Sequence, residues 1–358
     1  MAGNADPDSG YMLVLNGSPY GPIGGTSATA PLYAGLVALL NATLGEPAGY
    51  LNYNLYRFAG PYVYRDIADG GSNSAEGSPG YTAGAGWDAC TGFGSINGSN
   101  LLMALRGLGL APALAVFKGK LYMAWKGVER DESIWWTTFD GTHWAPQQQV
   151  PGVWTSDGPS LAVFNGKLYM AWKGMYGDQR IWWTTFDGTH WTAQQLVPGV
   201  WTSVGPALAV FKGKLYMIWK GMDGDQRIWW TSFDGTHWAA QQSIAGVGTT
   251  HGPSLAVFNG ALYAAWKGIF GDQGIYVSHF DGTHWAAQQH VAGIATSLGP
   301  ELAVFNRKLY MTWKGMLGDE RIWWTTFDGA HWATQQQVPG VWTSPDLAKA
   351  AAGEAGTL

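Results

Sequence analysis

A unit of 47 residues repeats five times along this chain of 358 residues. One tryptophan and one turn aspartate recur at that spacing, and five units fill residues 111–345 without a remainder. A fixed period of this length is typical of architectures in which each unit packs against its neighbours. The recurring residues are Trp125, Trp172, Trp219, Trp266 and Trp313, and Asp140, Asp187, Asp234, Asp281 and Asp328.

Within one unit the apolar residues alternate with a period of two, which predicts strands rather than helices. Strands are expected at residues 161–164, 167–174 and 180–186, with a fourth at about 190–197 that ends at Pro198-Gly199. The dipeptides Asn165-Gly166 and Asp187-Gly188 are typical of tight hairpins. Four short antiparallel strands in 47 residues match one blade of a β-propeller. The absent 3.6-residue period argues against a helical solenoid, and a sandwich would not need five equal units.

The fold class predicted is therefore mainly β, with a five-bladed β-propeller at 111–345. We expect the recurring tryptophans to be core residues. The blades are expected at residues 111–157, 158–204, 205–251, 252–298 and 299–345.

The spacing and the Asp-Gly-x-x-Trp turn resemble the five-bladed tachylectin type of lectin propeller. The pattern LAVF-NGKLYMAWKG followed by DGTHW is also similar to bacterial repeat propellers related to fucose-binding lectins. The resemblance implies binding of glycans or glycoproteins. This implication stays an expectation, because propellers host many functions.

Positions that differ between near-identical blades are the best candidates for a binding site. Trp154, Trp201 and Trp342 end blades 1, 2 and 5, whereas blades 3 and 4 have Gly248 and Ala295 there. A core tryptophan replaced by glycine would leave a large cavity, which costs roughly 3–5 kcal/mol. We therefore expect the three tryptophans to be exposed, in the loop between blades, where an indole face suits a sugar ring. Packing remains the alternative.

A second variable position follows a Gly-Asp-Gln or Gly-Asp-Glu loop. It is arginine in three blades, but Ser133 in blade 1 and Gly274 in blade 4. An arginine fork can donate paired hydrogen bonds to vicinal hydroxyls or to a carboxylate. Blades 2 and 5 have the most complete set, and blade 4 is degenerate. The candidate residues are Arg180, Arg227 and Arg321 with Asp178, Asp225 and Asp319.

Two other readings of the repeats are less favoured. The turn histidines (His143, His190, His237, His284 and His331) occur once per blade, too far apart to share a metal ion. Sialidases are propellers with aspartate turns, but their turn has one residue between aspartate and glycine, whereas Gly188 follows Asp187 directly. The sequence also offers no blade with the clustered arginines and the Tyr/Glu pair of such enzymes.

Residues 1–107 have a different composition, with long Gly-rich loops. Helices are expected from Pro31 to Leu44, at 52–58 and at 99–106. The strings 3-GNADPDSGY-11, 24-GGTSA-28 and 84-GAGWDACTGFGS-95 resemble, in order and spacing, the C-terminal third of the sedolisin family. Those proteins are secreted serine-carboxyl peptidases with a subtilisin-like fold, so this resemblance implies an α/β fragment and an extracellular location.

The sedolisin resemblance also implies site residues. Ser27 matches the nucleophile, and one Ca²⁺ would be held by Asp66 and Asp88 with the carbonyls of Ile67, Gly84 and Gly86. The acid pair that activates the serine has no counterpart here, and a hydroxyl without its base is a poor nucleophile. We expect no peptidase activity from this chain alone.

Composition limits the remaining classes of function. A net charge of −5 gives no reason to expect nucleic acid, and no apolar stretch approaches the ~18 residues of a membrane span. No signal peptide is expected at the N-terminus, and Cys90 is the only cysteine. We expect a linker at 108–110 and a loose tail at 346–358. The favoured function is a multivalent lectin-like propeller on a truncated sedolisin domain. The alternatives are a secreted endopeptidase whose missing part lies upstream, and a protein-interaction propeller without affinity for sugar.

Overall fold

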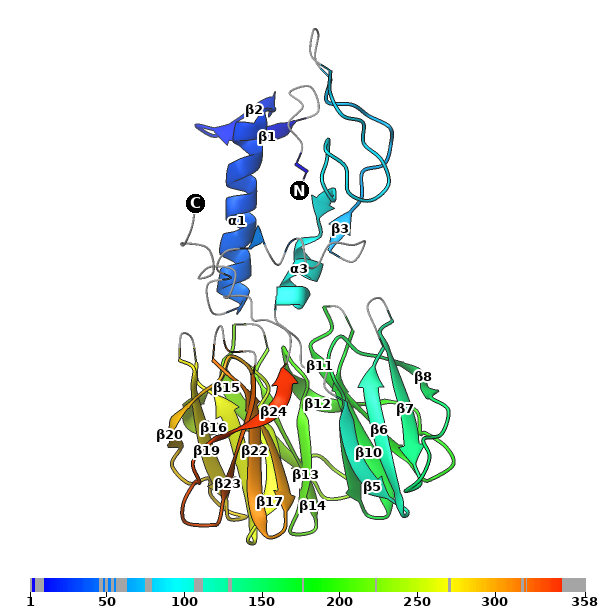
Figure 1. Ribbon diagram of the computed structural model, residues 1–358, viewed down its shortest axis with the longest axis vertical. Coiled ribbons are helices and arrows are strands. Elements are labelled where there is room, and N and C mark those ends of the chain that lie inside the picture. Colours follow the sequence, from blue (N-terminus) through cyan, green and yellow to red (C-terminus); the bar gives the residue numbers. More distant parts are fainter. Residues whose placement is uncertain are drawn as a thin grey trace. The chain divides into compact units, whose positions relative to one another are not determined.

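The computed structural model divides into two compact units, residues 1–107 and residues 108–349 (Figure 1). Each unit is described by itself. The residues described are 2–3, 10–44, 48, 51–52, 55, 63–74, 79–105, 112–127, 131–175, 177–222, 224–269, 272–316, 319 and 321–342. The expected linker at 108–110, the tail at 346–358 and most of the helix expected at 52–58 lie outside these residues.

The larger unit contains five four-stranded antiparallel sheets, each made of consecutive strands, as a five-bladed propeller requires. Blade 1 consists of β5 (Ala113–Phe117), β6 (Lys120–Lys126), β7 (Ser133–Phe139) and β8 (Gln148–Trp154), and blade 2 of β9 (Ser160–Phe164), β10 (Lys167–Lys173), β11 (Arg180–Phe186) and β12 (Gln195–Trp201). Blade 3 consists of β13 (Ala207–Phe211), β14 (Lys214–Lys220), β15 (Arg227–Phe233) and β16 (Gln242–Gly248). Blade 4 consists of β17 (Ser254–Phe258), β18 (Ala261–Lys267), β19 (Gly274–Phe280) and β20 (Gln289–Ala295), and blade 5 of β21 (Glu301–Phe305), β22 (Lys308–Lys314), β23 (Arg321–Phe327) and β24 (Gln336–Trp342).

The fourth strand of each blade begins later than the sequence predicts. In blade 2 it spans Gln195–Trp201 and continues through Pro198-Gly199 instead of ending there. The pairing between β11 and β12 shifts register between Arg180 and Trp182, and Gly199 has a φ of 69°. A bulge of this kind accommodates Pro198-Gly199 within the strand, whereas proline and glycine are disfavoured in a regular ladder. Trp201 therefore ends a strand, whereas the sequence placed it in a loop.

The recurring tryptophans form the blade cores, as expected. Trp172, Trp219 and Trp266 are fully buried, and Trp313 is 3% exposed. Trp125 of blade 1 is only half-buried. In the described part of the chain, β21 of blade 5 makes no contact with β5 comparable to those between the other inner strands, so this side of blade 1 is less covered.

Each Asp-Gly turn is held by its own aspartate. In blade 3, Asp234 accepts hydrogen bonds from the amide and hydroxyl of Thr236 and from the amide of His237, at 2.7 Å each. The other Asp-Gly turns show the same bonds to the aspartate from the two residues that follow the glycine, except that Ala330 lacks a hydroxyl. The histidines of these turns therefore act as turn residues.

The smaller unit holds the hairpin of β1 (Tyr11–Leu15) and β2 (Ser18–Ile23), the helices α1 (Thr26–Leu44) and α3 (Gly98–Leu105), and the short strands β3 (Tyr64–Arg65) and β4 (Ser95–Ile96). α1 begins at Thr26, five residues before the predicted start, so Pro31 lies inside the helix and Ser27 in its first turn. Leu32 and Leu39 of α1 are 53% and 69% exposed. This unit therefore leaves apolar helix surface uncovered.

The turn aspartates predict how the stability of the propeller depends on acid. The amides of His237 and Thr236 and the hydroxyl of Thr236 lower the pKa of Asp234 to about 2. A depressed pKa adds stability that is complete above the unfolded value of about 3.9 and is lost as the pH falls through about 2. Melting followed by tryptophan fluorescence should therefore show a falling melting temperature between about pH 4 and pH 2. Asp234→Asn should shrink that dependence; equal slopes in both proteins would contradict the assignment.

Candidate functional site

A pocket of about 490 Å³ opens at the junction of blades 2 and 3. It is lined by Gly177, Asp178, Gln179, Arg180, Trp201 and Met222. Three of these residues, Asp178, Arg180 and Trp201, are predicted from the sequence as ligand contacts. Its volume lies within the range of small-molecule sites.

Strand pairing brings the predicted tryptophan and arginine together. Arg180 is the first residue of β11 and lies directly opposite Trp201 of β12. Residues in this relation project from the same face of a sheet, with their β-carbons about 5 Å apart. Trp201 is 48% exposed and the Arg180 side chain 49% exposed. An indole surface and a guanidinium thus face solvent side by side.

The carboxylate of Asp178 fixes the orientation of Arg180. Its Oδ1 accepts from the Arg180 amide and from Nε, at 3.0 and 2.7 Å. Its Oδ2 accepts from Nη2 at 3.1 Å and from Trp182 Nε1 at 2.9 Å. Burial raises the pKa of Asp178, but the hydrogen bonds from Arg180 and Trp182 outweigh that effect and lower it. Both oxygens already have two protein donors, so direct contact between Asp178 and a sugar stays a prediction.

Trp182 contacts both Arg180 and Asp178, a role that the sequence analysis missed. Its indole lies under the guanidinium, with Arg180 Cζ 5.1 Å from the ring centroid, while its Nε1 bonds Asp178. Blade 4 shows that the donor matters, because Tyr276 replaces this tryptophan and its hydroxyl bonds Asp272 at 2.8 Å. The retained donor in Tyr276 was the sequence signal that could have revealed the role.

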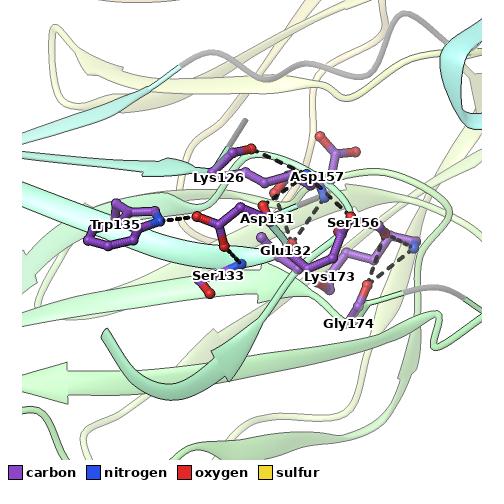
Figure 2. A network of polar contacts seen from close by, with 11 residues as sticks. Lys126, Asp131, Glu132, Ser133, Trp135, Ser156, Asp157, Lys173 and Gly174 are labelled. Atoms are coloured by element: carbon purple, nitrogen blue, oxygen red, sulfur yellow. Dashed lines mark hydrogen bonds and ion pairs between the residues drawn. The ribbon is translucent and has the colours of Figure 1, made fainter. Parts of the chain in front are cut away.

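A glycine and a buried lysine place the loop that carries the aspartate. A β-carbon on Gly174 would lie 2.4 Å from Asp178 Cγ, so only glycine allows this approach. Lys173 is 2% exposed, and its ammonium donates to Ser156 Oγ at 2.6 Å in the segment that joins blades 1 and 2. Figure 2 shows this network beside its counterpart in blade 1, where Lys126 lies 3.5 Å from Glu132 and Asp131 binds Trp135.

The remaining junctions each lack part of this set. Blade 1 has Trp154, 48% exposed, opposite Ser133 in place of arginine. Blade 3 keeps Arg227 on Asp225 but pairs it with Gly248. Blade 4 pairs Gly274 with Ala295. Blade 5 has both Arg321 on Asp319 and Trp342, but Trp342 is 64% exposed, and no following blade packs beside it among the residues that the structure describes.

The wall contributed by the following blade was not predicted. Met222 of blade 3 lines the pocket together with residues of blade 2. The equivalent residues, Met175, Ile269 and Met316, are also 42–50% exposed. A lone exposed methionine gives no sequence signal, because only the junction geometry shows which blade it serves.

The predicted calcium ligands lie around one loop of the smaller unit. Gly86 donates its amide to Asp66 at 2.7 Å, and Gly84 donates to Asp88 at 3.2 Å. Bonds led by the Thr91 amide lower the pKa of Asp88. Among the described residues no three His, Cys, Asp or Glu side chains gather as a metal cluster, so a Ca²⁺ here would depend on two carboxylates and carbonyl oxygens.

Ser27 is exposed in the first turn of α1. Within the described residues, no hydrogen bond joins its hydroxyl to an acid or a base. Ser27 thus lies at a helix N-terminus, where a hydroxyl needs an adjacent base to act as a nucleophile.

Comparison with curated proteins gives relatives for one segment of the chain. A stretch of 105 residues, 29% of this chain, is 52% identical to kumamolisin of Bacillus sp. strain MN-32. A similar share is 35% identical to human tripeptidyl-peptidase 1. Homologues from the sedolisin family thus cover about 29% of the chain. The chain spans about a fifth of the length of these relatives (19% and 21%), so their activity comes to this chain only as a proposal.

The propeller has relatives in fold alone. A fucose-specific lectin from Aleuria aurantia is 15% identical, with a TM-score of 0.48 over 64% of this chain and 78% of the lectin. An α-L-arabinofuranosidase from Clostridium thermocellum is 14% identical, with a TM-score of 0.44 over 63% of this chain and 93% of that one. At these identities and TM-scores the likenesses select no function. No family model matches the chain. In the described parts of the chain, no helix is both long and apolar enough to cross a membrane.

Substitution of the pocket tryptophan should leave the propeller stable. Trp201→Ala removes a half-exposed side chain at a position where blades 3 and 4 have Gly248 and Ala295. Its matched control, Trp219→Ala, empties a fully buried site and should cost about 3–5 kcal/mol of unfolding free energy. Denaturant unfolding should therefore separate the two variants by at least about 2 kcal/mol. Similar losses in both would show that Trp201 is a packing residue.

Proposed function

We propose that the propeller is a carbohydrate-binding module and that the junction of blades 2 and 3 is its principal site. The observation that carries the proposal is the exposed pairing of Trp201 with Arg180 in a pocket walled by Met222. An indole face provides an apolar surface for the C–H groups of a sugar ring. A fixed guanidinium beside it supplies donors for hydroxyl or carboxylate oxygens.

Arg180 is held in a fixed orientation that suits ligand binding. Its Nε and Nη2 are used by Asp178, whereas no hydrogen bond from Nη1 is found among the described residues. Because the guanidinium lies on Trp182 and is held by Asp178, little side-chain freedom is left to lose on binding. A pyranose with vicinal hydroxyls, on a glycan or a glycoprotein, fits this set of groups.

A glycan array should test this assignment on the full chain. The wild type should bind, and Trp201→Ala should lose about 1 kcal/mol, close to a fivefold fall in affinity. Arg180→Ala should weaken the same glycans. Trp154→Ala is the matched control, because Trp154 is equally exposed but faces Ser133, and it should have a smaller effect. A folded protein that binds no glycan would favour the protein-interaction alternative.

The converse experiment adds a site. Ser133→Arg places an arginine on Asp131, opposite Trp154 and next to Met175, and so completes the set at the junction of blades 1 and 2. The number of glycans bound per chain, measured by calorimetry, should rise by one. An unchanged number would show that the tryptophan and arginine pair is insufficient.

For the smaller unit we propose a Ca²⁺ site and an extracellular setting beside glycosylated substrates. Support comes from the sedolisin relatives and from the loop that brings Asp66 and Asp88 to the same backbone. Gly94 allows the backbone to approach the proposed ligand Asp66 closely. A β-carbon on Gly94 would lie 2.0 Å from the Arg65 carbonyl oxygen and 2.9 Å from Asp66 Cα. When bound, Ca²⁺ would tie residues 66–67 to residues 84–88.

Calcium should raise the melting temperature of the smaller unit. The described helices, α1 and α3, both lie in this unit, so circular dichroism at the helical band reports its unfolding. The double change of Asp66→Asn with Asp88→Asn should abolish the shift, because it removes both charged ligands. A shift that survives in the double variant would place the metal elsewhere.

A further inference from the structure

Four junctions between successive blades are built in the same way. The phenylalanine that ends the first strand of one blade packs under an aromatic pair of the next, as Phe164 does 6.4 Å from Phe233. In the three junctions between blades 1 and 4 a tryptophan of the third strand also meets the turn tryptophan of the next blade, as Trp183 meets Trp238 at 6.1 Å, whereas blade 4 has Val277 at this position. In blades 1 to 4 this phenylalanine is only 3–4% exposed.

The fifth pair of faces remains open. Phe305 of blade 5 is 62% exposed, and Trp144 of blade 1 is 49% exposed. The inner strands from β5 to β21 each lie beside the next, but β21 has no comparable contact with β5. The blade 5 face presents Phe305, Tyr310, Trp324 and Val341, and the blade 1 face presents Leu121, Met123, Phe139 and Trp144.

The glycines of the Asp-Gly turns show independently that the blade 1 face is open. A β-carbon added to the turn glycine of blades 2 to 5 would lie 2.7–3.0 Å from a side chain of the preceding blade. At Gly141 of blade 1 nothing within the described chain lies within 4 Å of such a carbon. The blade 1 face therefore has the residues that form a junction in the other blades, but no blade of the described chain packs on it.

We propose that these two faces pair between copies of this chain, with blade 5 of one copy against blade 1 of another. Exposed apolar patches rimmed by polar groups mark interaction surfaces. The four closed junctions within the chain show which surface fits each face, because apolar residues at equivalent positions pack there each time. The two faces differ, so the pairing is head to tail rather than two-fold symmetric.

The rim of the blade 5 face supports a contact of this kind. In two closed junctions a lysine of the first hairpin donates to a carbonyl of the next Asp-Gly turn, as Lys118 does to Asp187 and Lys212 to Asp281, both at 2.5 Å. Blade 5 has Asn306 at the lysine position, and the next residue of the hairpin, Arg307, offers a cation to the Asp140 turn of a second copy.

The centre of the blade 5 face makes the pairing reversible. Thr312 is exposed where blades 2 to 4 bury Ala171, Ile218 and Ala265. Burial of its hydroxyl against apolar atoms weakens this junction relative to the other four. We therefore expect association that depends on concentration.

The test measures mass against concentration by light scattering on the full chain. The wild type should shift from one chain mass toward two or more as concentration rises. Phe305→Arg and Trp144→Arg each place a charge on one face and should be monomeric. Both positions are exposed, so the melting temperature should stay unchanged. Leu196→Arg, at an exposed apolar position away from both faces, is the control and should associate like the wild type.

Mixing the two monomeric variants gives the decisive result. Phe305→Arg keeps an intact blade 1 face and Trp144→Arg an intact blade 5 face, so an equimolar mixture should form a 1:1 dimer that grows no further. A wild type that stays monomeric at every soluble concentration would overturn the proposal in favour of closure within one chain. A mixture that fails to associate would overturn it as well, since head-to-tail pairing requires complementation. Neither result depends on whether the propeller binds sugar.

Discussion

Aromatic packing between neighbouring blades is the interaction on which the rest of the propeller depends. A four-stranded blade is too thin to have its own core, so both of its faces must be covered by other blades. Trp183 of blade 2, for example, lies 5.2 Å from Phe233 and stacks on Tyr169. This packing reaches the middle of each blade but not the ends of its outer strands. The outer ends are therefore free to vary, which is where Trp201 gives way to Gly248 and Ala295.

The candidate site lies at the boundary between this constant packing and the variable ends. The carboxylate of Asp178 connects the two, because it accepts from the half-buried Trp182 below and from the exposed Arg180 above. Its position depends in turn on Gly174 and on the network around Lys173. Replacement of the exposed residues thus changes what the junction can bind, whereas replacement of the supporting residues would disturb the loop itself. This difference explains how near-identical blades can present unequal sites.

Much of the propeller could be predicted from local patterns, because alternation and hairpin dipeptides act over a few residues. Strand β11 was predicted to the residue, whereas the fourth strand was misplaced because Pro198-Gly199 looked like a stop and is a bulge. Pro31 likewise suggested a helix start but lies inside α1. Trp154, Trp201 and Arg180 were found by comparing blades. Met222 and the open faces were not, since a repeat count does not determine the angle between blades.

The unequal junctions change how such a module could bind tightly. Several weak sites on one rigid ring would gain affinity by avidity, but within the described residues only the junction of blades 2 and 3 combines the tryptophan, the arginine and the following-blade wall. One exposed stack contributes on the order of 1 kcal/mol, so a single copy of the proposed site would bind weakly. Avidity would then come from several copies held together, where the second binding event becomes intramolecular. Head-to-tail pairing through Phe305 and Trp144 would supply those copies, since each added chain brings one more complete junction without using the residues that line it.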